Sequence, residues 1–209
     1  MNIGILGAGN VGGTLARAWA RRGHQIVFGV RDPDSPKTRE AVEGCGGKAR
    51  AGAVEEAARC EVVVNALPFS ATKEALQALN LSGKVLLDCA NPLKGDLSGL
   101  EIGTTTSAGE MAAQWTKGAK VVKIFNTTGY NNMADPNYGS VPLTMFYCGD
   151  DADAKRIAAS LARDVGFDPV DAGPLSNARL LEPLAMLWIW LAIPGGMDGA
   201  FGFKLLTRA

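Results

Sequence analysis

The chain has 209 residues, 47% of them apolar and 20% charged, which is typical of a globular protein able to bury a full hydrophobic core. Lysine plus arginine number 21, as do aspartate plus glutamate, so the net charge is zero. Neither a nucleic acid nor a membrane surface is therefore expected as the main partner, because both favour a basic excess. The one histidine, His24, and four widely spaced cysteines predict no metal site.

Two further features bear on the compartment. The N-terminal run MNIGILGAG lacks the charged start of a signal peptide, and the longest apolar stretch, 183–197, is too short to cross a bilayer. Cysteines without redox or metal spacing are typical of buried thiols in a reducing environment. We therefore expect a cytoplasmic protein.

Short apolar runs alternate with amphipathic stretches along the chain, the pattern of parallel strands joined by crossover helices. The run 61–67 is apolar enough for a strand buried on both faces, and Ser107 and Glu110 form a capping-box pattern at a helix start. The expected strands are 2–6, 25–30, 48–51, 61–67, 84–89, 121–125 and 143–148. The expected helices are 10–22, one on each side of the third strand within 36–60, 70–79, 107–115, 151–165 and 175–193.

This order predicts an α/β fold over residues 1–172, a Rossmann-type doubly wound and mostly parallel sheet. Residues 173–209 differ in character, and we expect a short C-terminal helical lobe that completes an acceptor cleft or a dimer interface. The helix from Leu180 to Leu191 is apolar nearly all round, so it must be buried inside the monomer, under a ligand or against a second subunit. Besides internal packing, a homodimer is the arrangement we expect.

The first expected strand runs directly into a glycine motif, Gly7-Ala8-Gly9-Asn10-Val11-Gly12, that opens a helix. In a G-x-G-x-x-G of this context, the first glycine allows a tight turn and the second lets the backbone approach a pyrophosphate. The third lets the helix pack closely on the strand, and the helix N-terminus faces the anion. The motif predicts a dinucleotide site.

The end of the second strand indicates which dinucleotide is bound. An NAD enzyme usually has an acidic residue there, whereas this chain has Val30 followed by Arg31. A guanidinium can grip a 2′-phosphate through paired charge-assisted hydrogen bonds, and Ser35 or Lys37 can add a hydroxyl or a second charge. We therefore expect NADP(H) rather than NAD.

Two segments should border the nicotinamide half, because ligands of such sheets lie outside the carboxyl ends of the strands. The first is 65–68, with Ala66, Leu67 and Pro68, after the fourth strand, and the second is 89–92, with Asn91, after the fifth. The polar run that starts with Asn126 and Thr127 lies at the same edge of the sheet and is expected to form the substrate-facing rim, with these two residues as candidate contacts of the hydride acceptor.

The absence of two catalytic patterns from the sequence excludes some classes of dehydrogenase. No tyrosine is followed four residues later by lysine, and the one histidine lies at the start of the second strand, so short-chain and histidine-dependent dehydrogenases are excluded. What remains is hydride transfer to a flavin-like acceptor, whose own ring nitrogens handle the protons. Two alternatives stay open: a non-catalytic NADP(H)-binding redox sensor, and a reductase of a small imine, carbonyl or quinone with Tyr130 as proton donor.

These residues resemble a known family, the short NADP-linked oxidoreductases of the deazaflavin coenzyme F420, and also the reductase domain of the ferric-reducing STEAP proteins. The resemblance extends over nearly the whole chain. Its segments are Gly7 to Gly12, Gly29-Val30-Arg31, Cys148 to Asp151, Asp171 to Glu182 and Phe201 to Leu206.

The resemblance implies that the glycine loop binds the pyrophosphate of NADP(H), that Arg31 binds the 2′-phosphate, and that a deazaflavin lies between the nucleotide domain and the C-terminal lobe. It also implies that no side chain is an obligatory proton donor. At Asn126 the archaeal deazaflavin enzymes have a histidine, and Lys123 to Thr127 looks more like the STEAP-type segment. A flavin, a quinone or another small acceptor therefore stays open beside the deazaflavin.

Overall fold

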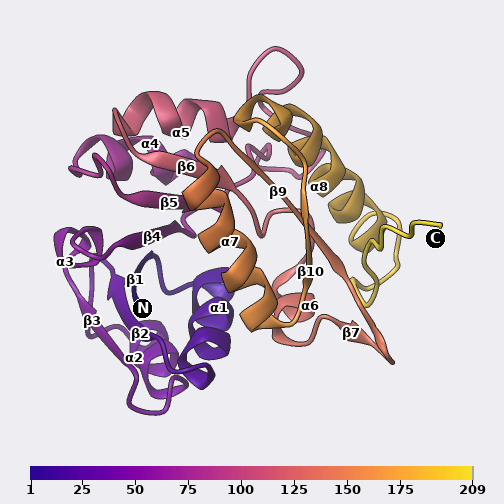
Figure 1. Cartoon of the computed structure of the whole chain (residues 1–209). Helices are drawn as coiled ribbons and strands as arrows, with labels where there is room; N and C mark the ends of the chain where they lie inside the picture. The colour runs from indigo at the N-terminus through magenta and orange to yellow at the C-terminus, as the bar shows by residue number, and fades with distance from the viewer. Residues whose placement is uncertain (209) are drawn as a thin grey trace.

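The computed structural model describes residues 1–208 and contains an eight-stranded sheet with helices on both faces (Figure 1). Its strand order is β10-β9-β6-β5-β4-β1-β2-β3, and all neighbours are parallel except β6 and β9. The predicted Rossmann-type, mostly parallel sheet is therefore confirmed. The strands are β1 (Asn2–Leu6), β2 (Gln25–Gly29), β3 (Ala49–Gly52), β4 (Val62–Asn65), β5 (Val85–Asp88), β6 (Lys120–Lys123), β9 (Thr144–Gly149) and β10 (Asp168–Asp171).

Apart from the short helix at 130–134, the helices lie close to their expected positions. Three of them begin at a side-chain cap: Ser35, Ser107 and Asp151 each accept a hydrogen bond from a first-turn amide. The helices are α1 (Asn10–Arg21), α2 (Pro36–Glu43), α3 (Val54–Ala58), α4 (Phe69–Gln77), α5 (Ala108–Thr116), α6 (Tyr130–Ala134), α7 (Ala152–Val165) and α8 (Ala178–Ala192), with a single 3-10 turn, η1 (Leu175–Asn177), before α8.

Alternate side chains of the strands enter two separate cores. Ile3 and Ile5 of β1 pack in a core with side chains of α1, α2, α6 and α7, whereas Leu6 packs with side chains of α3, α4 and α5. This division follows from the period-two geometry of a strand, which sends neighbouring side chains to opposite faces. Because helices cover both faces, the central strands are apolar on both sides, as the run in β4 predicted.

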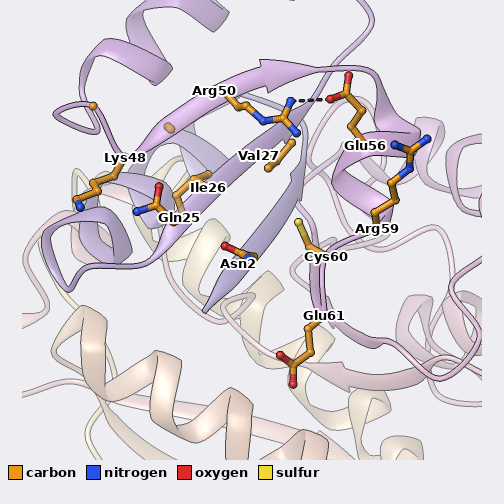
Figure 2. A pocket seen from close by; sticks show the side chains of 12 residues that line it. Asn2, Gln25, Ile26, Val27, Lys48, Arg50, Glu56, Arg59, Cys60 and Glu61 are labelled. Carbon is orange, nitrogen blue, oxygen red and sulfur yellow. Dashed lines mark hydrogen bonds and ion pairs between the residues drawn. The ribbon is translucent and has the colours of Figure 1, made fainter.

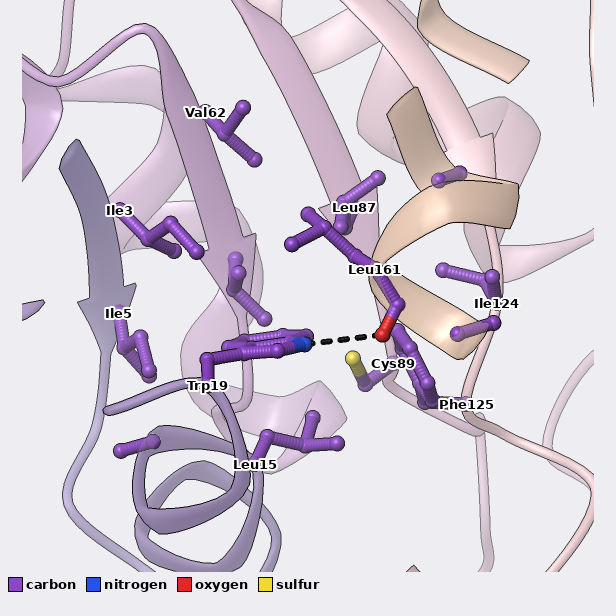
Figure 3. Close-up of a cluster of buried hydrophobic side chains, with 14 of the residues drawn as sticks. Ile3, Ile5, Leu15, Trp19, Val62, Leu87, Cys89, Ile124, Phe125 and Leu161 are labelled. Carbon is purple, nitrogen blue, oxygen red and sulfur yellow. Dashed lines mark hydrogen bonds between the residues drawn. The ribbon is translucent and has the colours of Figure 1, made fainter. Parts of the chain in front are cut away.

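Trp19 occupies the centre of the first core (Figure 3). Its indole nitrogen donates a hydrogen bond of 3.0 Å to the carbonyl of Leu161 in α7, and its ring meets Phe125 edge-on at 5.7 Å between ring centres. A buried indole N–H is costly without a partner, so this bond fixes α1 against α7. The glycine loop that precedes α1 is thereby attached to a rigid helix.

Four elements, one short helix and three strands, were not expected from the sequence. Tyr130 lies in the short helix α6, not in a loop, and β7 (Asn137–Tyr138) pairs with β8 (Val141–Pro142) as a small hairpin. The polar strand β10 pairs with β9 and extends the sheet. Its sequence, Asp-Pro-Val-Asp, has none of the apolar bias of the central strands, because β10 lies at an edge of the sheet.

The C-terminal segment crosses the outer strands of the sheet. Helix α8 packs on β9 and α5, and the tail returns to β9 through a hydrogen bond of 2.9 Å from the Thr144 amide to the Phe203 carbonyl. Within residues 1–208, the structure has no helix with the length and apolar character of a transmembrane span.

Candidate cofactor and acceptor site

The glycine loop connects β1 to α1 in the conformation that its motif predicts. Gly7 has φ of +97°, a region that favours glycine, and its amide donates a hydrogen bond of 3.1 Å to the Gly29 carbonyl at the end of β2. A Cβ on Gly12 would lie 2.2 Å from the Gly7 carbonyl oxygen, so a larger residue would push α1 away from the loop. Gly9 is the N-cap of α1 and offers no capping side chain, which leaves the first helical amides available to an anion.

A cavity of about 550 Å³ opens in front of this loop, at the carboxyl ends of β1, β2, β4 and β5. It contains all the predicted cofactor-binding residues except Gly12, which is buried behind the loop, and Arg31. The structure thus brings together segments that are more than 80 residues apart in the chain. The lining residues are Gly7, Ala8, Gly9, Asn10, Val11, Val30, Ser35, Lys37, Thr38, Ala66, Leu67, Pro68, Phe69, Cys89, Ala90, Asn91 and Leu93.

The end of the cavity beside β2 is polar and basic. Ser35 caps α2, with its hydroxyl oxygen 2.8 Å from the hydroxyl oxygen of Thr38. Lys37, in the first turn of α2, lines the cavity, and its ammonium would lie 3.9 Å from a Cβ on Gly9. Arg31 is exposed directly after the lining residue Val30. Two cations therefore lie at the end where the sequence predicts a 2′-phosphate.

The opposite end of the cavity is mainly apolar. Phe69 and Leu93, which sequence reasoning did not identify, line it beside the predicted Leu67 and Pro68. The Phe69 ring packs on Trp115 of α5, with ring centres 6.1 Å apart. Burial strongly raises the pKa of the Cys89 thiol, so this group stays protonated near neutral pH.

Asn126 and Thr127, the candidate acceptor contacts, lie behind this end and do not line the cavity. The Asn126 amide donates to the Asn91 side-chain oxygen and to the Leu181 carbonyl, at 3.1 Å each, and Asn91 donates in return to the Asn126 carbonyl. The Thr127 hydroxyl is 2% exposed and faces the Met145 sulfur at 4.0 Å. Both residues therefore contact other protein groups, and a direct role with an acceptor stays a prediction.

A cluster of buried charges adjoins the same wall, and sequence reasoning missed it. The Lys123 ammonium lies 2.9 Å from Asp88 and 2.8 Å from Glu182, and none of the three side chains is more than 1% exposed. Burial alone would lower the pKa of Lys123, but the charges and hydrogen bonds of the two carboxylates raise it above its ordinary value. The available signal was a lysine inside the apolar run Val121 to Phe125.

The aromatic residues of the C-terminal segment do not close the cavity. Trp188 and Phe201 stack on each other at 5.3 Å between ring centres, and Trp190 is 52% exposed. None of the three lines the cavity, and neither does Tyr130, which is 49% exposed at the start of α6.

A second hollow, of about 660 Å³, lies at the amino ends of β1 and β2 (Figure 2). Its side chains include the ion pair between Arg50 and Glu56, at 2.6 Å, and none of the predicted site residues. Ligands of doubly wound sheets bind at the carboxyl ends of the strands, so the cavity at the glycine loop is the candidate site.

Comparison with known proteins places the chain in a family. The family described as NADP oxidoreductase, coenzyme F420-dependent, matches residues 2–92, which contain the glycine loop and every lining residue except Leu93. A structure of a candidate F420-dependent NADP reductase from Arthrobacter sp. FB24 is 32% identical, with a TM-score of 0.83, and the match covers 98% of this chain and 99% of that one.

Two further similarities are more limited in extent or identity. The metalloreductase STEAP3 of Rattus norvegicus is 31% identical over 193 residues, which are 90% of this chain and 37% of that protein. This chain therefore spans little more than a third of that relative. An Aspergillus terreus reductive aminase in complex with NADPH has a TM-score of 0.69 but 18% identity over 93% of this chain and 63% of its own, so it shows the fold alone.

The shared fold, the glycine loop with its cavity, and the full-length match at 32% identity give one conclusion. The chain belongs to the family of coenzyme F420-dependent NADP oxidoreductases.

Proposed function

We propose that the chain is an NADP(H)-dependent oxidoreductase that transfers hydride between NADPH and a deazaflavin- or flavin-like acceptor. The observation that carries this proposal is the cavity at the carboxyl edge of the sheet, which has a basic end, the glycine loop and an apolar end. These three parts match the adenosine 2′-phosphate, the pyrophosphate and the nicotinamide ring of NADP(H).

The residues present fit the cofactor without rearrangement of the loop. Gly9 leaves room for a pyrophosphate against the first amides of α1, while Gly7 and Gly12 allow the turn and the close packing of the helix. Arg31, Lys37 and the Ser35 hydroxyl would hold the 2′-phosphate, and Leu67, Pro68 and Leu93 would exclude water from the nicotinamide end. When bound, NADPH supplies the hydride, so the protein's task is to bind, orient and keep the ring dry.

The nature of the acceptor follows from the titratable groups beside the cavity. Among the lining residues only Lys37 and Cys89 titrate, and Lys37 lies at the basic end. The Cys89 thiol, with its raised pKa, is a poor proton donor near neutral pH. A deazaflavin or flavin suits such a site, because its ring nitrogens exchange protons with solvent and need no protein acid.

The C-terminal segment supports an enzyme more than a closed redox sensor. A sensor would benefit from a nicotinamide pocket sealed by Trp188, Trp190 or Phe201, and these side chains lie elsewhere. The segment after residue 172 would instead lie near the acceptor through α8 and would also form the contact between two subunits. We therefore propose a homodimer that associates through the exposed side of α8.

We also propose a cytoplasmic location, since all four cysteines are buried and free.

The test is oxidation of NADPH, followed by nicotinamide absorbance, with F420, FAD, FMN, a quinone or no acceptor present. We expect turnover with one ring-containing acceptor and much slower turnover with NADH in place of NADPH. Tight NADPH binding without turnover of any acceptor would contradict the proposed hydride transfer and favour the sensor. The same assay with a small imine or a small carbonyl compound tests the other alternative, since turnover restricted to these would favour a reductase that uses Tyr130.

A further inference from the structure

The buried cluster of Lys123, Asp88 and Glu182 lies directly behind the apolar end of the cavity. The Lys123 ammonium comes from the end of β6, Asp88 from the end of β5 and Glu182 from α8. The cluster is therefore the point where the carboxyl edge of the sheet meets the C-terminal helix. The proposed hydride transfer assigns no chemistry to it.

One cavity-lining residue, Ala90, is held by the cluster on both sides of its backbone. Its amide donates to Asp88 Oδ1 at 3.3 Å, and its carbonyl accepts a hydrogen bond from Lys123 Nζ. The next residue, Asn91, also lines the cavity, and its side chain is paired with Asn126 in both directions. The position of the cavity wall formed by Ala90 and Asn91 therefore depends on the position of the Lys123 ammonium.

Helix α8 in turn sets the position of the ammonium. Both Glu182 carboxylate oxygens accept hydrogen bonds from the first amides of α5, Ala108 at 3.0 Å and Gly109 at 3.1 Å, which fixes the carboxylate. The neighbouring Leu181 carbonyl accepts from Asn126 at 3.1 Å. Two consecutive residues of α8 are thus attached to the wall of the cavity.

Stability alone does not account for such a cluster. Three charges without access to water carry a large desolvation cost, which their mutual attraction and hydrogen bonds barely repay. Well-packed apolar side chains of the same shape generally give a core of equal or greater stability. The excess negative charge is offset here by the amides at the N-terminus of α5, so the arrangement is a specific one.

We propose that Lys123, held by Asp88 and Glu182, is a positioning residue for the nicotinamide end of the cavity. Its ammonium fixes the position of the Ala90 carbonyl and of Asn91 beside the nicotinamide ring. The negative charge of Glu182, on α8, fixes the position of the ammonium. This inference rests on the proposed function, since it requires NADP(H) to occupy the cavity.

The test compares ligands with and without nicotinamide on Glu182→Gln, which keeps the side-chain shape and removes one charge. The ligands are NADPH, NADP⁺ and adenosine 2′,5′-bisphosphate, and their dissociation constants are measured by calorimetry. We expect Glu182→Gln to weaken NADPH and NADP⁺ about tenfold, as partial loss of a charge-assisted contact does. Binding of the bisphosphate should stay within about twofold of the wild-type value, because it does not reach Ala90.

Arg179→Met is the matched control, because it acts between the same two helices. It breaks the bridge from α8 to Glu110 of α5, at 2.6 Å, and touches neither Lys123 nor Ala90. A merely structural role for Glu182 predicts that the control and Glu182→Gln lower the thermal midpoint and weaken all three ligands alike. The positioning role predicts a change in the ratio of NADPH to bisphosphate affinity in Glu182→Gln alone.

A second variant is needed because Lys123→Met leaves two buried carboxylates without a cation and can unfold the core. The double variant Lys123→Met/Glu182→Gln removes one cation and one anion together and should show the same selective loss. Equal loss of all ligands, or no loss, in either folded variant overturns the inference. Failure of the wild-type chain to bind both NADPH and the bisphosphate would instead overturn the proposed function.

Discussion

Gly12 illustrates how one residue sets the geometry of the cofactor loop. A Cβ there would lie 2.2 Å from the Gly7 carbonyl and 3.1 Å from the Ile5 side chain, so no other residue fits without moving α1. Arg31 has the opposite character, since it is exposed and nothing in the packing requires an arginine. The predicted contact with a 2′-phosphate would explain an arginine at this position, so a substitution of Arg31 tests that prediction directly.

We expect Arg31→Ala to raise the dissociation constant of NADPH by one to two orders of magnitude. Loss of a charge-assisted contact to the 2′-phosphate costs roughly 1.5–3 kcal/mol. NADH lacks that phosphate, so its binding should hardly change. Fluorescence titration of both cofactors measures this difference.

Arg39→Ala serves as the control for this prediction. Arg39 is another exposed arginine, on α2, and its guanidinium lies 3.5 Å from Asp34. We expect no effect on either cofactor. An equal loss of NADPH and NADH binding in Arg31→Ala would exclude its role at the phosphate.

Helix α5 shows how an element is stabilised at its start by a partner far along the chain. Ser107 caps the helix and donates its hydroxyl hydrogen to Glu110 at 2.7 Å, while Arg179 of α8 makes two hydrogen bonds to the same Glu110 carboxylate, at 2.8 and 2.6 Å. The sequence predicted the cap but not the arginine. The bridge joins α8 to the nucleotide-binding part of the chain at its outer side.

This bridge predicts a dependence of stability on pH. The hydrogen bonds from Arg179 lower the pKa of Glu110, so its pKa is lower in the folded chain than in the unfolded chain. The stabilisation is therefore fully present at pH values above the ordinary pKa of glutamate. It is lost as the pH falls from there through the lowered pKa of the folded chain. We expect Glu110→Gln to reduce the free energy of unfolding by up to about 1 kcal/mol at neutral pH, because the pair is partly exposed.

Denaturant unfolding of both chains at neutral pH and at about pH 3.5 checks the sign, since the difference should shrink at the lower pH. Glu74→Gln, at an exposed position on α4, provides the comparison. A difference that stays constant between the two pH values would show that Glu110 acts through its shape and not its charge.

At the scale of the whole molecule, the outer side of α8 is the main apolar surface left uncovered. Leu180, Leu187, Trp190 and Ile193 are 66%, 49%, 52% and 60% exposed. Leu180, Leu187 and Trp190 recur at helical spacing and form a stripe along α8, which lies on the outside of the molecule, and Ile193 is the residue that follows the helix (Figure 1). Apolar stripes of this kind mark interfaces, and a second copy of the chain related by two-fold symmetry offers the same stripe in return.

We expect the chain to sediment as a dimer and Leu187→Glu or Trp190→Glu to sediment as monomers, because a charge in an apolar interface is costly. Val141→Glu, at an apolar position that is 43% exposed on the β7–β8 hairpin, should leave the dimer intact. Sedimentation velocity distinguishes the species. A monomeric wild-type chain at micromolar concentration would exclude this interface.

The sequence by itself determined the features that depend on neighbouring residues. The glycine loop, the central strands and the cap at Ser107 all follow from local patterns, because turns, strand periodicity and N-caps involve residues only a few positions apart. The same patterns predicted most of the residues that line the cavity, since a parallel sheet brings the carboxyl ends of its strands to one edge.

Only the tertiary structure decided features that join distant residues. The pairing of Lys123 with Asp88 and Glu182 spans 35 and 59 positions and leaves no local periodic signal. In the same way, the contacts of the Asn126 amide with Asn91 and with the Leu181 carbonyl, 55 positions away, could not be read from the strand end that it follows. Edge strand β10 was missed because pairing with β9, and not burial, makes it a strand. Local sequence reports conformation, whereas the partner of a buried polar group depends on which chain segments the fold brings together.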